Sequence, residues 1–191
     1  MTRRLILVLA VCALAHGQRR NAQPQTPEQL DKAAYIRQNY TKEEMLIPMR
    51  DGVNLFTSVY TPKDKSQQYP ILLLRTPYTV APYGSENYRR SLGPASEKFM
   101  REGFIFAYQD VRGKGRSEGA FVHVRPHNPS KKTSRDIDES SDTYDTIEYL
   151  TKNVPNNHGR VGMYGISYPG FYAAQGAIDA HPGCDSSFPM K

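Results

Sequence analysis

The segment Val161-Gly162-Met163-Tyr164-Gly165-Ile166-Ser167-Tyr168-Pro169-Gly170 decides the fold that we expect for this chain. It places Ser167 between two glycines, where a short apolar run changes to a helical pattern. A serine in this setting is typical of a nucleophile elbow, a sharp strand-to-helix turn that holds the serine hydroxyl clear of its neighbours. Gly165 and Gly170 leave room where a Cβ would collide with the strand or the helix. We therefore predict that Ser167 is a nucleophile.

The helix after this elbow is expected to supply part of an oxyanion hole. Apolar residues recur at helical spacing over residues 168–179, and Pro169 suits a first helical turn, where its missing N–H is not needed. The unpaired N–H groups at the start of such a helix point at a developing oxyanion. The backbone N–H of Tyr168, directly after the serine, is the expected donor.

A second segment matches the same glycine-serine-glycine pattern, so the pattern alone does not identify the nucleophile. This segment is Gly115-Arg116-Ser117-Glu118-Gly119. The residues after Ser117 include two prolines and show no helical period, which predicts a loop or a short extended piece. Ser167 has the strand-turn-helix context that the chemistry needs, whereas Ser117 lacks it.

The first 17 residues have the pattern of a secretory signal. Two arginines are followed by an apolar run of 11 residues from Leu5 to Ala15 and then by small residues. This run is shorter than the roughly 20 residues that span a bilayer. We expect cleavage and a secreted or periplasmic chain without membrane attachment, in which residues 18–40 form a polar linker and an N-terminal arm. A buried N-terminal helix is the alternative.

Composition argues against several classes of function. The 191 residues are 38% hydrophobic and 23% charged, as in a soluble globular domain. The formal net charge of +6 falls to +4 when Arg3 and Arg4 leave with the signal, and the remaining basic residues are scattered, so nucleic-acid binding has no support. Only Cys184 remains after cleavage, which excludes an intramolecular disulfide and a cysteine metal site. We predict no metal and no cofactor.

The rest of the chain alternates between strand and helix patterns. Asp51-Gly52 separates two extended runs, as in a β-hairpin. Apolar runs bounded by turn residues suit strands that are buried on both faces. The expected strands are residues 43–48, 54–61, 69–75, 103–110 and 160–164, and the expected helices are residues 27–40, 87–102 and 138–152 in addition to the one after the elbow. This order predicts an α/β sheet that begins antiparallel and becomes parallel.

Four motifs occur in order over residues 40–182 and resemble those of a known family. They are Met49-Arg50-Asp51-Gly52-Val53, Arg75-Thr76-Pro77-Tyr78, Gln109-Asp110-Val111-Arg112-Gly113-Lys114-Gly115-Arg116-Ser117-Glu118-Gly119 and Gly165-Ile166-Ser167-Tyr168-Pro169-Gly170. The chain resembles the X-Pro dipeptidyl-peptidase/CocE-NonD family of α/β-hydrolases, which includes cocaine esterase, α-amino acid ester hydrolases and glutaryl-7-aminocephalosporanic acid acylase. The resemblance implies an α/β-hydrolase fold and a serine hydrolase activity.

The resemblance also implies roles for individual residues. Ser167 would form an acyl-enzyme, and the Tyr78 hydroxyl would join the Tyr168 N–H in the oxyanion hole; a tyrosine that merely packs at a strand end is the alternative for Tyr78. Thr79 stands where α-amino acid ester hydrolases carry an acid that helps to hold the substrate's ammonium group, which argues against strict selectivity for such esters. The loop of residues 110–119 is expected to be structural, with Arg112 bonded to loop carbonyls or to Asp110.

The acid and the histidine of the catalytic triad have no expected counterpart here. In α/β-hydrolases both follow the serine well downstream, but only 24 residues follow Ser167. The histidines at positions 123, 127, 158 and 181 are all expected to lie away from the serine hydroxyl. We expect residues 41–182 to be the N-terminal part of a hydrolase domain, truncated after the elbow helix, and residues 183–191 to be an aberrant or truncated tail.

Two classes of function stay open. The first is a secreted serine hydrolase that cleaves ester or amide (acyl or X-Pro dipeptidyl) bonds of a small molecule or a short peptide. The second is an inactive truncated remnant without the triad acid and histidine. A sheet that stops at the nucleophile strand leaves that strand's outer edge uncovered, so we expect the chain alone to be unstable or to aggregate.

Overall fold

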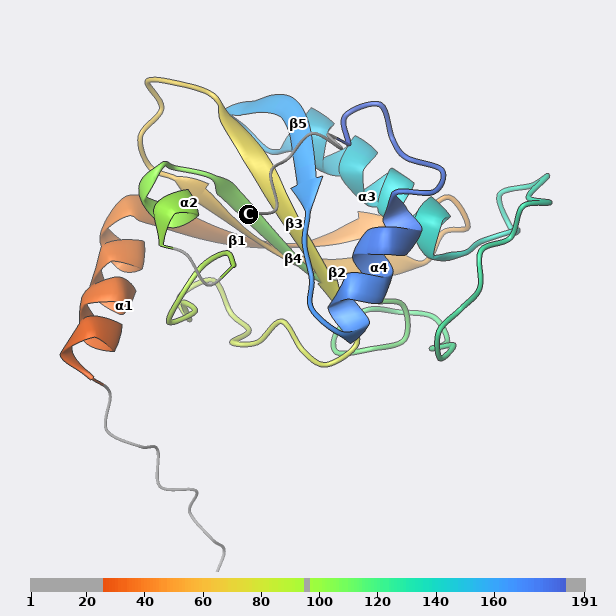
Figure 1. Cartoon of the computed structure of the whole chain (residues 1–191), viewed down its shortest axis with the longest axis horizontal. Helices are drawn as coiled ribbons and strands as arrows, with labels where there is room; N and C mark the ends of the chain where they lie inside the picture. The colour runs from red at the N-terminus through yellow and green to blue at the C-terminus, as the bar shows by residue number, and fades with distance from the viewer. Residues whose placement is uncertain (1–25, 95–96, 185–191) are drawn as a thin grey trace, which may run out of the picture.

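Five strands form one mixed sheet in the order β1-β2-β4-β3-β5 (Figure 1). The strands are β1 (Tyr40–Pro48), β2 (Asn54–Pro62), β3 (Tyr69–Thr76), β4 (Ile105–Asp110) and β5 (Asn157–Met163). β2 pairs antiparallel with both β1 and β4, whereas β3 pairs parallel with both β4 and β5. The sheet therefore begins antiparallel and becomes parallel, as the sequence predicts.

The computed structural model describes residues 26–94 and 97–184. The expected signal of residues 1–17, the first part of the linker and the last seven residues of the expected tail lie outside the described residues.

The β1–β2 hairpin turns at the predicted Asp51-Gly52 pair. Gly52 has φ of 86°, in a region that is open to glycine and unfavourable for other residues. Its N–H donates to the Met49 carbonyl at 2.9 Å, and the Met49 N–H donates to the Val53 carbonyl at 2.8 Å. The turn sets the register in which Pro48 faces Asn54.

Alternation along the strands divides the core between the two faces of the sheet, because successive strand residues point to opposite faces. On one face, Ile71 and Leu73 pack in a cluster with Ile147 of α3 (Glu139–Asn153). On the other face, Leu72 packs in a cluster with residues of α1 (Pro27–Asn39) and α2 (Lys98–Arg101). Both faces of β3 are thus covered, which explains why β3 reads as a continuous apolar run.

The helix after the elbow is α4 (Tyr168–Gly176), which contacts α3 and β3 (Figure 1). It ends three residues before the predicted boundary. α3 is held at its start by Asp138, whose carboxylate accepts the Ser141 N–H at 2.8 Å while the Ser141 hydroxyl accepts the Asp138 N–H at 2.9 Å. These two bonds satisfy donors that a helix N-terminus otherwise leaves unpaired. None of the described helices is long and apolar enough to cross a lipid bilayer.

The expected helix over residues 87–102 is wrong for most of its length, since only Lys98–Arg101 are helical. The chain before α2 forms a loop that is organised around the buried ammonium group of Lys42 in β1. Lys42 Nζ donates to three loop carbonyls and to one carboxylate: Pro82 at 2.7 Å, Gly84 at 2.8 Å, Asn87 at 3.0 Å and Glu44 Oε1 at 2.7 Å. These contacts come from a strand about 40 residues earlier in the chain and outweigh the local helical pattern.

Candidate active site

Ser167 lies at the turn between β5 and α4 and is solvent-exposed. Its backbone has φ of 59° and ψ of −124°, a conformation that residues other than glycine rarely adopt. Ser167 is the N-cap residue of α4, yet its side chain makes no capping hydrogen bond to the helix. The turn therefore presents the hydroxyl to solvent at the start of the helix, as a nucleophile elbow does.

The glycines beside Ser167 are required by close backbone contacts. A Cβ on Gly165 would lie 2.2 Å from the carbonyl carbon of Pro169 and 2.6 Å from the Gly170 nitrogen. A Cβ on Gly170 would lie 3.2 Å from the Gly165 oxygen. The strand and the helix thus approach each other at a distance that larger residues at position 165 would prevent.

The structure brings the three predicted site residues together at one edge of the sheet. β3 and β5 are parallel neighbours, so Tyr78, two residues after β3, and the elbow after β5 lie at the same edge. The Tyr78 side chain is 67% exposed. Its ring meets the Tyr168 ring edge-on, with 6.3 Å between the centroids and 83° between the planes. A tyrosine hydroxyl and a helix N-terminus are thereby available on the same side as Ser167.

The side chain of Tyr168 fixes the start of α4 in a way that the sequence does not indicate. Its hydroxyl accepts the Val124 N–H at 2.8 Å and lies 3.0 Å from Nδ1 of His123. Because the oxygen already accepts a backbone N–H, its own proton is available to an unprotonated Nδ1 of His123. The Tyr168 ring also stacks on Tyr172, with centroids 5.2 Å apart. Val124 has φ of 45°, a strained value for a β-branched residue.

A buried polar layer connects the elbow helix to the sheet and to α3. Arg75, near the end of β3, has a fully buried side chain that lies 5.7 Å from the ring of Tyr172 in α4. Its guanidinium donates to the Gln109 side chain and to the Thr143 hydroxyl, both at 2.8 Å. Burial raises the pKa of the Glu139 carboxyl in this layer, although Arg75 at 3.3 Å acts in the opposite direction. Buried charges of this kind are tolerated only when they are paired.

Arg112 has other partners than the sequence suggests. We expected it to bond loop carbonyls or Asp110, and this is wrong. Its guanidinium instead binds Asp142 at 2.7 and 3.0 Å and Asp51 at 2.8 and 3.2 Å. Arg112 thus joins the loop of residues 110–119 to the hairpin turn and to α3.

The contacts of Ser117 and Asp110 are those of a structural loop. The Ser117 hydroxyl donates to the Asp110 carbonyl at 2.5 Å and accepts the Phe56 N–H at 2.8 Å. The Asp110 carboxylate accepts the Val80 N–H at 3.0 Å and the Tyr83 hydroxyl at 2.8 Å. Ser117 therefore lies in a loop, as predicted, and its hydroxyl is engaged with the backbone.

Within residues 26–94 and 97–184, none of the four histidines has Ser167 as a hydrogen-bond partner. His181 Nε2 lies 2.6 Å from a carboxylate oxygen of Glu148, and its ring packs against Tyr144. His158 lies in β5 before Val161, towards the opposite end of that strand from the elbow, where its Nδ1 accepts the Arg160 N–H at 3.3 Å. His123 is the histidine that contacts the elbow helix, and it does so through Tyr168.

His127 lies in a charged cluster at the start of α3. Nδ1 of His127 and the carboxylates of Asp138 and Asp179 offer atoms that all lie within 4.8 Å of one another. The Lys131 ammonium pairs with both carboxylates, at 2.5 Å from Asp138 and 2.8 Å from Asp179. Burial opposes ionisation of Asp138, but hydrogen bonds from the Asn128 N–H and from Lys131 hold its pKa well below the usual range. A cation of the chain itself therefore balances this cluster.

Comparison with known proteins assigns the chain to a family. The sequence profile described as X-Pro dipeptidyl-peptidase (S15 family) matches residues 51–191. The chain belongs to this X-Pro dipeptidyl-peptidase family. The match confirms the resemblance that the four motifs indicate and identifies the chain as a member of a hydrolase family.

The X-Pro dipeptidyl-peptidase family member is similar to both esterases and a peptidase. It is 32% identical over 155 residues to cocaine esterase of Rhodococcus sp. (strain MB1 Bresler), which covers 79% of this chain and 24% of the esterase. Among solved structures it resembles an aminopeptidase from the marine sediment archaeon Thaumarchaeota archaeon, with 37% identity and a TM-score of 0.66 over 85% of this chain and 26% of that one. It also resembles an α-amino acid ester hydrolase, with 34% identity and a TM-score of 0.66 over 90% of this chain and 27% of that one.

These likenesses confirm the α/β-hydrolase fold, and the chain spans about a quarter of the length of each of these relatives. The family match includes residues 183–191, for which the sequence predicts a tail. On the outer edge of β5, the Val161 N–H donates to the Gly183 carbonyl at 2.8 Å, and Val161 forms a parallel bridge with Cys184. The domain boundaries given above stay predictions.

Proposed function

We propose that this chain carries the acyl-accepting centre of a serine hydrolase. Ser167 is the nucleophile, and the Tyr168 backbone N–H and the Tyr78 hydroxyl stabilise the oxyanion. The observation that carries the proposal is the exposed, strained backbone of Ser167 at the start of α4, beside the Tyr78 ring. Strained backbone of this kind is found where function requires it.

The proposed reaction has two steps. In the first, Ser167 Oγ attacks the carbonyl carbon of an ester or amide, its proton passes to a general base, and the carbonyl oxygen becomes an oxyanion held by the two donors. The bond to the alcohol or amine then breaks, and the leaving group takes up the proton. In the second step, water attacks the acyl-enzyme, which releases the acid and restores the hydroxyl. The resemblance implies that the base is a histidine downstream of the serine in the family's chain order.

The proposed substrates are small esters, amides or short peptides. The relatives are named as a cocaine esterase, an aminopeptidase and an α-amino acid ester hydrolase, which together favour acyl transfer from either oxygen or nitrogen. Thr79 follows Tyr78 and offers no charge for an ammonium group, so a strict preference for α-amino esters is not part of the proposal. The cationic and apolar pattern of residues 1–17 supports a secreted or periplasmic location.

The second candidate is the inactive remnant. It is favoured by the contacts of the described histidines, which bind Tyr168, Asp138, Arg160 and Glu148 instead of Ser167. Without a base, a serine hydroxyl is a weak nucleophile.

A fluorophosphonate probe, which reacts with activated serines, separates the two candidates. We expect the purified chain to be labelled and Ser167→Ala to lose the label. Ser117→Ala is the matched control, because Ser117 has the same glycine neighbours and a structurally engaged hydroxyl, so it keeps the label. Thermal melts show that each variant is folded. Label that persists in Ser167→Ala would contradict the assignment of the nucleophile, and no label on a folded wild-type chain would establish the remnant.

A further inference from the structure

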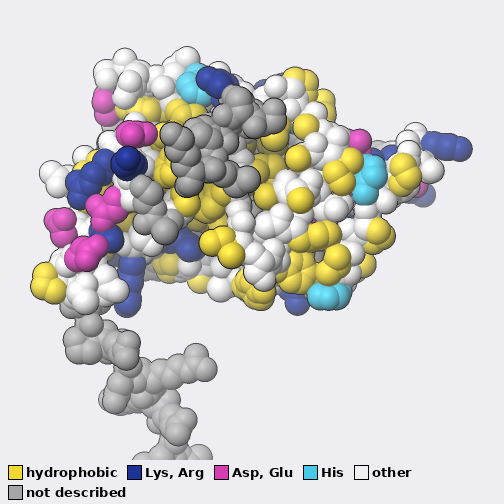
Figure 2. Space-filling model, viewed as in Figure 1, with side chains coloured by type: hydrophobic (Ala, Val, Ile, Leu, Met, Phe, Trp, Pro, Cys, Tyr) yellow, Lys and Arg dark blue, Asp and Glu magenta, His cyan; other side chains and the backbone are white. Residues whose placement is uncertain are grey.

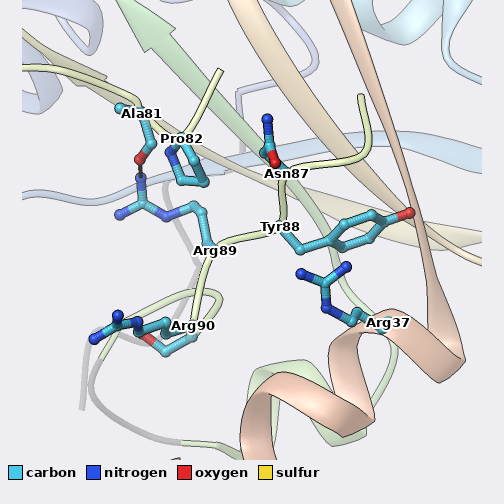
Figure 3. A pocket seen from close by; sticks show the side chains of 8 residues that line it. Arg37, Ala81, Pro82, Asn87, Tyr88, Arg89 and Arg90 are labelled. Atoms are coloured by element: carbon cyan, nitrogen blue, oxygen red, sulfur yellow. Dashed lines mark hydrogen bonds between the residues drawn. The ribbon is translucent and has the colours of Figure 1, made fainter. Parts of the chain in front are cut away.

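A pocket lies between the end of α1 and the loop that Lys42 organises (Figure 3). Its volume is about 510 Å³, within the range of roughly 300–1,000 Å³ that is usual for small-molecule sites. Three of the lining residues are arginines and none is acidic; the lining residues are Arg37, Ala81, Pro82, Asn87, Tyr88, Arg89, Arg90 and Ser91. None of the elbow residues lines this pocket, so it is separate from the proposed acyl centre.

Two of the arginines are held by neutral groups. The Arg37 guanidinium lies 5.3 Å from the centre of the Tyr88 ring, and its Nη1 is 3.5 Å from the Glu86 carbonyl oxygen, at the outer limit of a hydrogen bond. Arg89 Nη1 donates to the Ala81 carbonyl at 3.1 Å, and its guanidinium lies 4.4 Å from the centre of the Tyr108 ring. Carbonyls and rings fix the direction of a guanidinium without neutralising its charge, so the positive charge remains available to a ligand.

The loop is built before any ligand arrives. Three of its carbonyls turn inwards to the Lys42 ammonium, whose charge is balanced by Glu44 at 2.7 Å. The Arg89 N–H donates to the Tyr60 hydroxyl at 3.1 Å, and burial raises the pKa of Tyr60 to about 12, so this phenol adds no negative charge near neutral pH. A preformed loop lowers the ordering cost of binding.

We infer that this pocket binds a small organic anion. Its carboxylate or phosphate group pairs with Arg37 and Arg90, because a guanidinium matches the paired oxygens of both groups. Figure 3 shows these two arginines on either side of the hollow, with the Tyr88 ring beside Arg37. The ring and Pro82 supply an apolar surface for the rest of the ligand.

Calorimetric titration of the full chain tests the chemistry of the ligand. The probes are phenyl phosphate, benzoate, inorganic phosphate and benzyl alcohol. We expect at least one of the two organic anions to bind, benzyl alcohol to bind at least tenfold more weakly, and phenyl phosphate to bind more tightly than inorganic phosphate. The stronger of benzoate and phenyl phosphate identifies the preferred anionic group. Binding of neither organic anion, or equal binding of benzyl alcohol, would overturn the inference; equal binding of phenyl phosphate and inorganic phosphate would overturn its apolar part.

Variants test the assignment of residues. Arg37→Gln and Arg90→Gln should each weaken binding about tenfold, as expected for loss of a hydrogen bond to a charged group. Arg101→Gln is the matched control, because Arg101 is also exposed and lies 4.9 Å from the centre of a tyrosine ring, Tyr35, but does not line this pocket. Ser167→Ala should bind the anion as the wild-type chain does, so the pocket and the proposed nucleophile can fail independently. Unchanged binding in folded Arg37→Gln and Arg90→Gln would refute the site.

Discussion

At Ser167 the chain holds a backbone conformation that costs on the order of 1–3 kcal/mol in isolation. The cost is tolerated because β5 and α4 meet closely at Gly165, where a Cβ would overlap the backbone of Pro169. The consequence is chemical: the serine hydroxyl stands at the helix N-terminus, exposed and not used to cap the helix.

Gly165→Ala should therefore destabilise the chain or displace the elbow. The added methyl meets backbone atoms at 2.2 and 2.6 Å, and backbone cannot move aside as a flexible side chain can. We expect the free energy of unfolding to fall by about 3 kcal/mol or more, measured by denaturant titration. Gly52→Ala is the control, because its Cβ would meet nothing within 4 Å and only its φ of 86° opposes alanine, at a cost of about 1 kcal/mol. Equal losses in the two variants would refute the steric explanation.

Tyr78→Phe tests the second oxyanion donor. If the hydroxyl stabilises the oxyanion, its removal should slow acylation of Ser167 by about 10²-fold, as removal of one donor does elsewhere. The melting temperature should change little, because the side chain is 67% exposed. Ester hydrolysis under single-turnover conditions, or the rate of probe labelling, gives the measurement. Tyr35→Phe on α1 serves as the control, and an acylation rate in Tyr78→Phe equal to that of the control would remove Tyr78 from the proposal.

Between elements, Arg112 is the connection whose loss should matter most. It binds the buried Asp142 of α3 and Asp51 of the hairpin turn. Arg112→Gln leaves Asp142 with the more distant Arg75 at 3.8 Å, so a buried carboxylate loses its main partner. We expect the free energy of unfolding to fall by about 3–5 kcal/mol in chemical denaturation.

Arg50→Gln supplies the comparison for Arg112. Arg50 also binds an aspartate of α3 through two guanidinium nitrogens, but its side chain is 32% exposed. Water can replace that aspartate, so we expect a loss of about 1 kcal/mol or less. A loss in Arg50→Gln as large as that in Arg112→Gln would show that burial does not govern these pairs.

The elements that the sequence predicts correctly have local signals. The hairpin follows from Asp51-Gly52 between two extended runs, and the buried strands follow from short apolar runs. Asp138 begins α3 because its side chain caps the helix three residues later. In each case the residues that determine the structure lie within a few positions of one another.

What the sequence does not predict depends on partners far along the chain. Lys42 organises a loop about 40 residues later, and Arg112 finds Asp51 61 positions earlier. The contact between Tyr168 and His123 spans 45 positions. Periodicity describes which face of an element is apolar, and it carries no information about which distant polar group will meet which. The arginine pocket was missed for the same reason.

For the molecule as a whole, low pH should weaken folding. The pKa values of Asp51, Asp138 and Asp179 all lie below the usual range, and hydrogen bonds and ion pairs to Arg112 or Lys131 contribute to each. A group whose pKa is lowered by folding stabilises the chain above its unfolded value of about 4, and this contribution is lost as pH falls through the lowered value. The free energy of unfolding should therefore fall steadily from pH 5 to about pH 2.

Asp138→Asn isolates one part of this effect. Asparagine still caps α3 but carries no charge, so the variant should lose less stability than the wild-type chain over the same pH interval. Asp31→Asn removes a carboxylate whose side chain is 76% exposed and should leave the pH dependence nearly unchanged. Denaturant titrations at several pH values measure both. A pH dependence that is identical in Asp138→Asn and the wild-type chain would contradict the assignment.

The molecule places its predicted chemistry and its arginine pocket on different supports. The elbow is supported by the layer of Arg75, α3 and α4, whereas the pocket rests on α1 and the Lys42 loop. Figure 2 shows basic and acidic side chains gathered towards the α1 side of this view, whereas hydrophobic side chains occupy much of the other side. The two sites can therefore be altered separately by mutation.

Lys42 has a consequence for reagents that attack primary amines. Its ammonium is sealed beneath the loop, with no exposed side-chain surface, and three carbonyls hold it there. Acylation of this nitrogen can take place only after the overlying segment has lifted, and the acyl group then prevents its return. Covalent capture at one concealed amine would thus record each opening of the neighbouring surface and make that opening permanent.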